Sequence, residues 1–293
     1  MRSHRSTSAS DRTSTRPADG PVPAATGWAL PIITVVVVAA AIVVAFIGSG
    51  ALGGTPIAEA AGGVLSADAT PVAPAGSAFS IWSVIYLGLV AYAIWQLTPG
   101  ARRSARQSAL RPWALASVVL NAVWIWSVQL ELILGSVLVI VLLLAVLIRI
   151  MFILGAPRTG GITELVVVDG TFGLYLGWVS VAFLANTYAW LADAGADIVT
   201  RIPLGVVGIV VAAGIGVATA LLSAGRIAPA LATSWGLAWV AVGRTEGAYE
   251  APELVWTAVL AAAVVLVIAV AANVAVRSRV RSGQARSAAR TVK

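Results

Sequence analysis

Runs of about 20 apolar residues recur along the chain and are separated by short polar stretches. A helix of that length crosses the hydrocarbon core of a bilayer, which is about 30 Å thick. The pattern therefore predicts an all-α polytopic membrane protein with eight transmembrane helices, of which the seventh is short for a full crossing. The expected helices are 28–50, 78–98, 112–131, 133–154, 164–191, 203–223, 229–243 and 254–276. Almost nothing separates the third from the fourth, so these two should form a tight antiparallel hairpin.

The positions of the basic residues predict the orientation of the helices. Of the 19 Lys and Arg residues, only Arg201 and Arg244 fall on one side of the membrane when successive loops alternate sides. The excess of positive charge marks the cytoplasmic side, so both termini are expected in the cytoplasm of a plasma-membrane protein. The net charge of +7 therefore reflects membrane orientation rather than nucleic-acid binding. The first helix is taken as permanent because its apolar stretch is longer than that of a signal peptide, and cleavage near 48–51 stays open.

The main segments outside the predicted helices are two terminal tails and one long external loop. Residues 1–27 are rich in Ser, Thr, Arg and Pro and predict a disordered cytoplasmic tail. Residues 277–293 predict a second, basic tail near anionic headgroups. The external loop 51–77 is long, which is typical of a lid over a binding site, although a plain connector has the same composition.

The composition excludes most catalytic chemistry. The chain has no Cys, and its single His, His4, lies in the polar N-terminal tail. Thiol chemistry and a histidine-based metal site are therefore not expected, and no paired carboxylates suggest acid–base catalysis. We expect no enzyme activity and no required cofactor.

Aromatic and amide side chains recur at one depth on three of the predicted helices. In the stretch PVAPAGSAFSIWSVIY, Phe79, Trp82 and Tyr86 follow a proline-rich loop at i, i+3, i+7 spacing. The third predicted helix carries Asn121 and Trp124 on one face, and the fifth carries Trp178 and Asn186 on one face. These positions are expected at the same depth as the first three aromatic residues, below loop 51–77. Aromatic walls with a few polar groups suit a flat, largely apolar ligand, although such Asn residues also serve in helix packing. The candidate ligand-binding residues are Phe79, Trp82, Tyr86, Asn121, Trp124, Trp178 and Asn186.

Of the eleven Trp residues, five lie near the ends of the predicted helices, where indole groups meet the lipid headgroups. These expected interface residues are Trp28, Trp95, Trp113, Trp190 and Trp256.

Three blocks of sequence resemble the TspO/MBR family of tryptophan-rich sensory proteins, which includes the translocator protein or peripheral-type benzodiazepine receptor. The blocks are PVAPAGSAFSIWSVIY (71–86), LNAVW (120–124) and WVSVAFLAN (178–186). The resemblance implies a five-helix bundle over residues 28–191 that binds a porphyrin, haem or related tetrapyrrole under the first loop. The chain departs from the family pattern at Ile125, in its separated prolines and in lacking the Pro-Tyr of the fifth helix.

The resemblance leaves residues 203–276 as an additional three-helix membrane module, for which close Ala/Gly packing is the expected role. The basic residue that a sterol motif would require after Tyr188 is absent until Arg201, so no sterol binding is predicted.

Asp169, near the cytoplasmic end of the fifth helix, is the clearest buried-charge candidate. A charge inside a span is often functional, but pairing with Arg149 or Arg158 is the preferred interpretation. Because nine residues correspond to a half-integral number of turns, Asp169 should lie opposite Trp178 and outside the aromatic pocket.

The leading hypothesis is a sensor or translocator that binds a small hydrophobic ligand in the lipid bilayer. Two alternatives remain: a secondary transporter of a small hydrophobic solute, and a porphyrin-degrading photochemical enzyme. A homodimer also stays open.

Overall fold

The computed structural model describes residues 27–51, 53–155, 161–223 and 225–291. This part of the chain is helical and contains no strand. The long helices are α1 (Ala29–Gly48), α3 (Ile81–Trp95), α5 (Ala105–Gln129), α6 (Ile133–Leu154), α8 (Thr171–Asp193), α9 (Ile202–Leu222), α10 (Ile227–Val242) and α11 (Pro252–Thr291). The short ones are α2 (Ala60–Gly63), η1 (Gly76–Ser80), α4 (Pro99–Arg103), α7 (Gly161–Glu164), η2 (Leu165–Gly170) and η3 (Asp197–Thr200).

The eight long helices correspond one to one to the eight predicted helices. Within the described residues, seven helical segments are long and apolar enough to cross a membrane. The remaining helix, α10, has 16 residues, in agreement with the predicted short seventh helix. The polytopic all-α membrane fold is thus confirmed.

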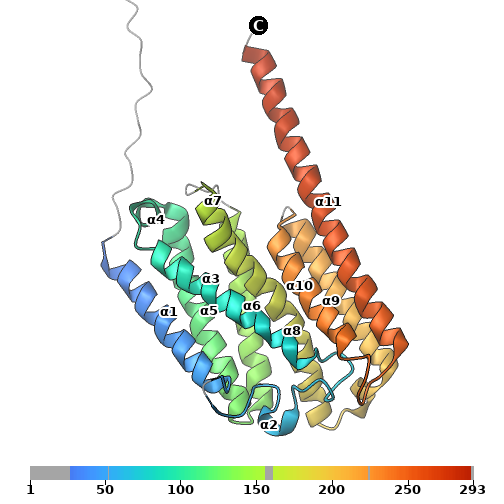
Figure 1. The fold of residues 1–293 in the computed structure, drawn as a ribbon. Helices are drawn as coiled ribbons and strands as arrows, with labels where there is room; N and C mark the ends of the chain where they lie inside the picture. Colours follow the sequence, from blue (N-terminus) through green and yellow to red (C-terminus); the bar gives the residue numbers. More distant parts are fainter. Residues whose placement is uncertain (1–26, 52, 156–160, 224, 292–293) are drawn as a thin grey trace, which may run out of the picture.

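The two ends of the bundle are easily distinguished in Figure 1. One end holds the start of α1 and the basic part of α11, and we call it the terminal end. The opposite end holds the segment between α1 and η1, residues 53–75, which we call the lid. The turn between α5 and α6 also lies at the lid end and consists of three residues, of which Glu131 takes a positive φ of 60°. The predicted tight hairpin is therefore present.

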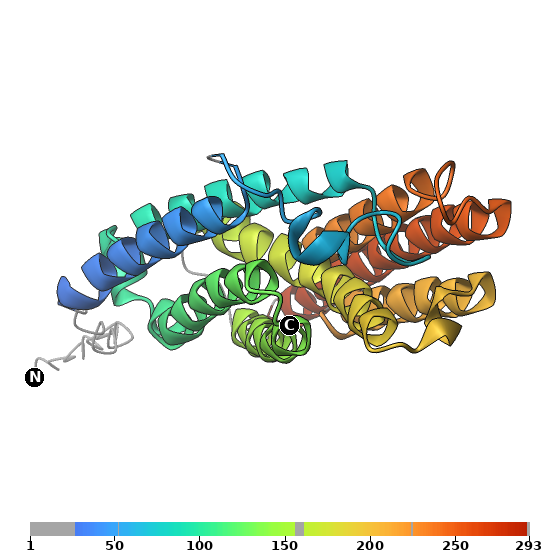
Figure 2. The ribbon, with the colours of Figure 1, turned by 90° about the horizontal axis from the view of Figure 1, so that it is seen from below.

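Buried apolar side chains form two clusters. The first is built by α1, α3, α5, α6 and α8, and the second mainly by α9, α10 and α11. Figure 2 shows these two groups of helices in the two halves of an elongated cross-section, with α8 between them. The clusters meet where α8 packs on α10, and small residues permit this close approach. A Cβ added at Gly177 would collide with the carbonyl oxygen of Pro229, and one added at Gly236 would lie 2.9 Å from Val181.

Two predicted boundaries are wrong. The third predicted helix starts at Ala105 rather than at 112, because the Ser104 hydroxyl caps it by accepting a hydrogen bond from Gln107 N at 3.4 Å. As a consequence, Arg106 belongs to a helix and not to a loop. At the other terminus, α11 continues through the basic segment to Thr291, where an unstructured tail was expected. The predicted N-terminal tail, 1–27, falls almost wholly outside the described residues.

The fifth predicted helix is not uniform. It begins with α7, continues through η2, which has π-helical geometry, and becomes α8 at Thr171. Asp169 lies in the π-helical part and is 4% exposed. Such π segments are frequent at functional sites because they reposition the side chains of one turn.

Candidate aromatic binding site

Trp82 of α3 is the centre of an aromatic cluster. Its ring stacks on Tyr86 with centroids 5.4 Å apart and an interplanar angle of 23°. Trp178 of α8 meets the same ring edge-on at 6.3 Å and 89°. Trp124 of α5 lies 6.3 Å away in a tilted arrangement. The three predicted aromatic faces therefore do converge, and Trp82 is buried inside the protein rather than turned to lipid.

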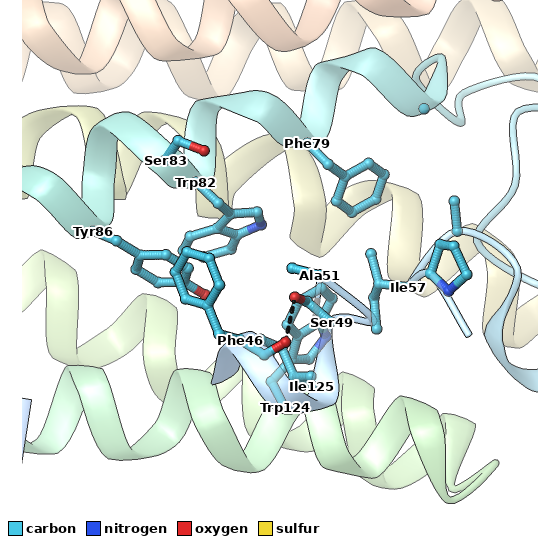
Figure 3. Close-up of a pocket in the computed structure, with 13 residues that line it drawn as sticks. Phe46, Ser49, Ala51, Ile57, Phe79, Trp82, Ser83, Tyr86, Trp124 and Ile125 are labelled. Atoms are coloured by element: carbon cyan, nitrogen blue, oxygen red, sulfur yellow. Dashed lines mark hydrogen bonds between the residues drawn. The ribbon is translucent and has the colours of Figure 1, made fainter. Parts of the chain in front are cut away.

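A cavity of about 240 Å³ opens beside this cluster. Figure 3 shows Trp82 and Tyr86 of α3 on one side of the space and Phe46 of α1 directed toward it from another. The lid contributes Ile57 to the wall. The residues that line the cavity are Phe46, Ser49, Ala51, Pro56, Ile57, Ala58, Gly76, Phe79, Trp82, Ser83, Tyr86, Trp124 and Ile125.

Four of the seven predicted site residues line this cavity, and three do not. Phe79, Trp82, Tyr86 and Trp124 are on its wall. Trp178 contacts the rings of Trp82 and Phe79 edge-on but does not line the cavity. Together with Asn186 it borders a separate space of only about 20 Å³. The remaining residue, Asn121, borders neither space.

The two predicted amides hold the aromatic rings in place. Asn121 Nδ2 donates to the Tyr86 hydroxyl at 2.9 Å. Trp124 Nε1 donates to Asn186 Oδ1 at 3.0 Å, and Asn186 Nδ2 in turn donates to Ser136 Oγ on α6 at 2.8 Å. Hydrogen bonds between membrane helices fix their relative positions. The structure therefore uses both amides in packing, which was the alternative interpretation of these residues.

Two buried polar atoms of the cluster are without a hydrogen-bond partner among the described residues. They are Asn121 Oδ1 and Trp178 Nε1. Buried polar atoms are usually paired, and each exception needs an explanation. Asn121 contacts Tyr86 and Trp178 contacts Trp82, so the aromatic cluster retains one unused acceptor and one unused donor.

The sequence analysis missed the contribution of α1. Phe46 of α1 lies 5.6 Å from the Tyr86 ring, and Ile125 of α5 also faces the cavity. Phe46 is the one aromatic residue within α1 and lies in the last turn at its lid end. This position in the sequence could have identified it as a candidate site residue. Ile125 occupies the position where the resemblance led us to note a departure.

The lid is anchored by the second group of helices through Arg244. Its side chain is fully buried and donates to the carbonyl oxygens of Thr70 at 3.0 Å, Ala73 at 3.4 Å and Ala67. Burial lowers the pKa of the Arg244 guanidinium, while the nearby Asp68 and Tyr249 act in the opposite direction. Arg244 was only a topology marker in the sequence analysis, and it is in fact the main polar anchor of the lid.

Further contacts extend this anchorage to the start of the aromatic helix. Ala75 N donates to the carbonyl of Trp239 at 3.0 Å, and Trp235 Nε1 donates to the carbonyl of Ala78 at 3.0 Å. Trp235 and Trp239 of α10 thus contact the segment that leads into Phe79 and Trp82.

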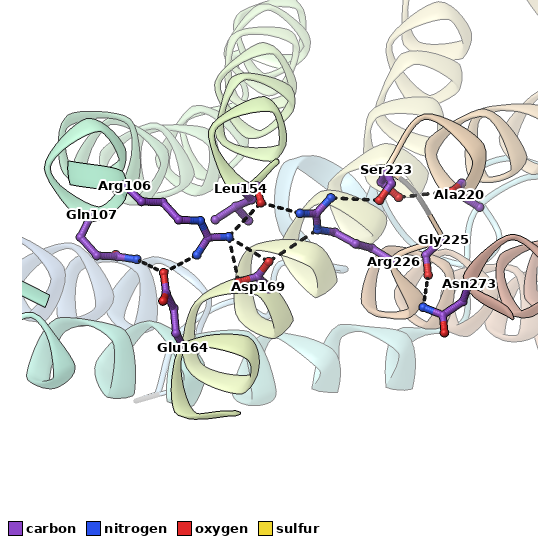
Figure 4. A network of polar contacts seen from close by, with 10 residues as sticks. All are labelled: Arg106, Gln107, Leu154, Glu164, Asp169, Ala220, Ser223, Gly225, Arg226 and Asn273. Carbon is purple, nitrogen blue, oxygen red and sulfur yellow. Dashed lines mark hydrogen bonds and ion pairs between the residues drawn. The ribbon is translucent and has the colours of Figure 1, made fainter. Parts of the chain in front are cut away.

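At the terminal end, a buried charge network joins α5, η2 and α10 (Figure 4). Arg106 donates to Glu164, to both carboxylate oxygens of Asp169 at 3.0 Å and to the Leu154 carbonyl at 2.9 Å. Arg226 approaches Asp169 with Nε 3.6 Å from Oδ1. Asp169 lines no part of the aromatic cavity, as predicted.

One of the two predicted partners of Asp169, Arg149, is wrong. Arg149 instead lies over the Trp113 ring, with Cζ 5.8 Å from its centroid, and Arg158 falls outside the described residues. Because α5 starts a full two turns earlier than expected, Arg106 enters the bundle on the side of Asp169. Within the described residues no three His, Cys, Asp or Glu side chains come together as metal ligands would.

Comparison with known proteins gives one match. The family model described as "TSPO-like protein" matches residues 31–271. It therefore spans α1 to the middle of α11, including the three helices that the sequence analysis set apart. No curated protein and no solved structure matches the chain. Since the matched region covers most of the sequence, the chain belongs to the family of TSPO-like proteins.

Proposed function

We propose that the protein binds a flat, largely apolar ligand in the aromatic cavity, and that this ligand is a porphyrin or a related tetrapyrrole. The observation that carries the proposal is the wall built by Trp82 and Tyr86. The two rings are stacked and buried, yet both border the cavity. A continuous aromatic surface of this kind favours a planar conjugated ligand, which it binds by stacking and by apolar contact.

The size of the cavity determines how such a ligand would enter. Sites for small molecules have volumes of about 300–1,000 Å³, and the cavity of about 240 Å³ is slightly smaller. A whole tetrapyrrole therefore requires the lid to move away from Trp82. Pro56, Ile57 and Ala58 of the lid line the cavity, so their displacement would enlarge it directly.

The same arrangement favours binding over catalysis. The walls of the cavity carry aromatic, aliphatic and hydroxyl side chains and no ionisable carboxylate or amine. Acid–base catalysis needs a positioned proton donor or acceptor. We assign the protein a sensor or translocator role in the plasma membrane, with both termini in the cytoplasm because the basic residues gather at the terminal end.

Porphyrin titration monitored by tryptophan fluorescence tests the proposal. The wild-type protein should show saturable quenching by protoporphyrin. Trp82→Leu should weaken the affinity about tenfold, because one stacking partner and its apolar area are lost. Trp178→Leu should have a smaller effect, since Trp178 contacts Trp82 but does not line the cavity.

Trp113→Leu provides the matched control for the loss of one fluorophore. Trp113 is 37% exposed and does not line the cavity. Its removal should leave the affinity unchanged. Equal affinities for Trp82→Leu and Trp113→Leu would contradict the proposed site.

A further inference from the structure

A second and larger hollow lies between the two groups of helices, toward the terminal end. Its volume is about 810 Å³, within the range of binding sites for small molecules. The walls come from α3, η2 with the start of α8, α10 and α11, so it separates the two groups of helices. It shares no lining residue with the aromatic cavity.

The hollow, which we call the terminal groove, has an apolar part that faces the bilayer. Leu87 of α3 is 70% exposed, Val166 of η2 is 62% exposed and Leu231 of α10 is 49% exposed, and all three line the groove. Side chains of this type in a membrane-spanning region contact acyl chains. The apolar wall is therefore suited to a hydrocarbon chain that enters from the lipid.

The polar part of the groove is concentrated where α9, α10 and α11 approach each other. It holds Ser223, Arg226, Asn273 and Arg277. Asp169 also borders the groove, but its carboxylate is already bound by Arg106 and approached by Arg226. The ionised groups that line the groove, Asp169, Arg226 and Arg277, leave an excess of one positive charge.

The depth of Arg277 agrees with the position of a lipid headgroup. Arg277 follows Pro252, the first residue of α11, by 25 residues, which is about 38 Å along a helix. The hydrocarbon core is about 30 Å thick. An Arg at this distance therefore lies just beyond the hydrocarbon, at the level of the phosphate groups, while the apolar wall of α3 and α10 lies within it.

We propose that the terminal groove binds an anionic membrane phospholipid, with its phosphate at Arg277 and one acyl chain along the wall formed by α3 and α10. Arg226, whose guanidinium already donates to the carbonyl groups of Ser223 and Leu154, contributes positive charge beside this phosphate. Bound there, the lipid fills the space between the two groups of helices. The site is independent of the aromatic cavity and of the ligand proposed for it.

Native mass spectrometry of the full chain in detergent, with added phosphatidylglycerol or phosphatidylcholine, tests this site. We expect phosphatidylglycerol to bind about tenfold more tightly than phosphatidylcholine. Arg277→Gln should weaken phosphatidylglycerol binding about fivefold, the contribution of one basic residue near a membrane surface. It should leave phosphatidylcholine binding and the melting temperature unchanged, because Arg277 is exposed.

Arg279→Gln is the matched control. Arg279 is exposed on the same helix and does not line the groove, so it should not change the lipid preference. Ala91→Phe, which fills the apolar part of the groove, should weaken the binding of both lipids.

Three results would overturn the proposal. The first is equal binding of the two lipids. The second is an equal loss for Arg277→Gln and Arg279→Gln, which would indicate a diffuse attraction to the basic end of α11. The third is full displacement of the lipid by inorganic phosphate, which would indicate an anion site without an acyl-chain site. Porphyrin quenching should be the same in Arg277→Gln and in the wild type, which separates this test from that of the aromatic cavity.

Discussion

Both ends of the bundle bury arginine side chains, and the partners of Arg106 and of Arg244 differ. At the terminal end, Arg106 is bound by the carboxylates of Glu164 and Asp169. At the lid end, Arg244 is bound by three main-chain carbonyl groups of the lid. A buried charge without its counter-charge is costly, whereas a carbonyl that loses its donor can hydrogen-bond to water when the loop moves. The terminal end is therefore built to stay closed, and the lid end can open.

This difference between the two ends agrees with the properties of the aromatic cavity at the lid end and of the terminal groove at the other. The aromatic cavity is partly lined by the lid and would have to enlarge to accept the tetrapyrrole that we propose as its ligand. The terminal groove is already large and is bordered by Asp169, which the charge network holds. Binding of the two proposed ligands would thus require movement at the lid end and none at the terminal end.

Removal of Arg106 should have the largest effect. Arg106→Gln leaves Glu164 and Asp169 buried without their main counter-charge, and this costs about 3–5 kcal/mol of unfolding free energy. Thermal unfolding in detergent measures the loss. Arg103→Gln, at an exposed position at the end of α4, is the control. Equal melting temperatures for the two variants would show that the network is not what holds the terminal end closed.

The contact between the two groups of helices runs through α8 and α10, and Gly177 tests it. In Gly177→Ala the new methyl group would meet the Pro229 carbonyl, and overpacking of this severity costs about 3 kcal/mol. Gly214→Ala is the control, because a Cβ there would meet nothing within 4 Å, and its effect should stay within about 1 kcal/mol. If both variants unfold at the same temperature, the two groups of helices are not tightly packed at this point.

Removal of Arg244 should have a smaller effect on stability and a larger one on the lid. Arg244→Met leaves three carbonyl groups without a donor, and the loss should be about 2 kcal/mol because the lid can reach water. Limited proteolysis should then cut residues 53–75 more rapidly. Arg201→Gln, exposed at the same end, serves as the control. Unchanged proteolysis of the lid in Arg244→Met would remove the distinction between the two ends.

The sequence predicted the helices well because the bilayer dictates their length and composition. An apolar run of about 20 residues crosses the bilayer as an α-helix, because a helix satisfies its backbone hydrogen bonds internally. The convergence of Trp82, Trp124 and Trp178 was also predictable, since helical periodicity and membrane depth place these side chains on facing surfaces.

The partners of polar side chains were less predictable because they depend on the rotation of each helix against its neighbours. Asn186 could not be assigned to packing without knowledge that Ser136 of α6 faces it. Arg106 and Arg244 looked like ordinary topology-determining charges, since a count of basic residues does not show which of them enters the protein. The capping function of Ser104 was the one local signal for the position of Arg106.

The smallest expected effect concerns the hydrogen bond between Trp235 and the start of the aromatic helix. Trp235 Nε1 donates to the Ala78 carbonyl at 3.0 Å, and Trp235→Phe removes this donor while keeping an aromatic ring. A single neutral hydrogen bond contributes about 1 kcal/mol, so the melting temperature should fall slightly. Trp256→Phe is the control, because Trp256 is 65% exposed. If α10 supports the aromatic wall through this bond, porphyrin affinity should also fall in Trp235→Phe and not in Trp256→Phe. If the two variants bind porphyrin with the same affinity, the Trp235 bond does not support the aromatic wall. Arg244 and the hydrogen bond of Ala75 N would then be the contacts that hold the lid end.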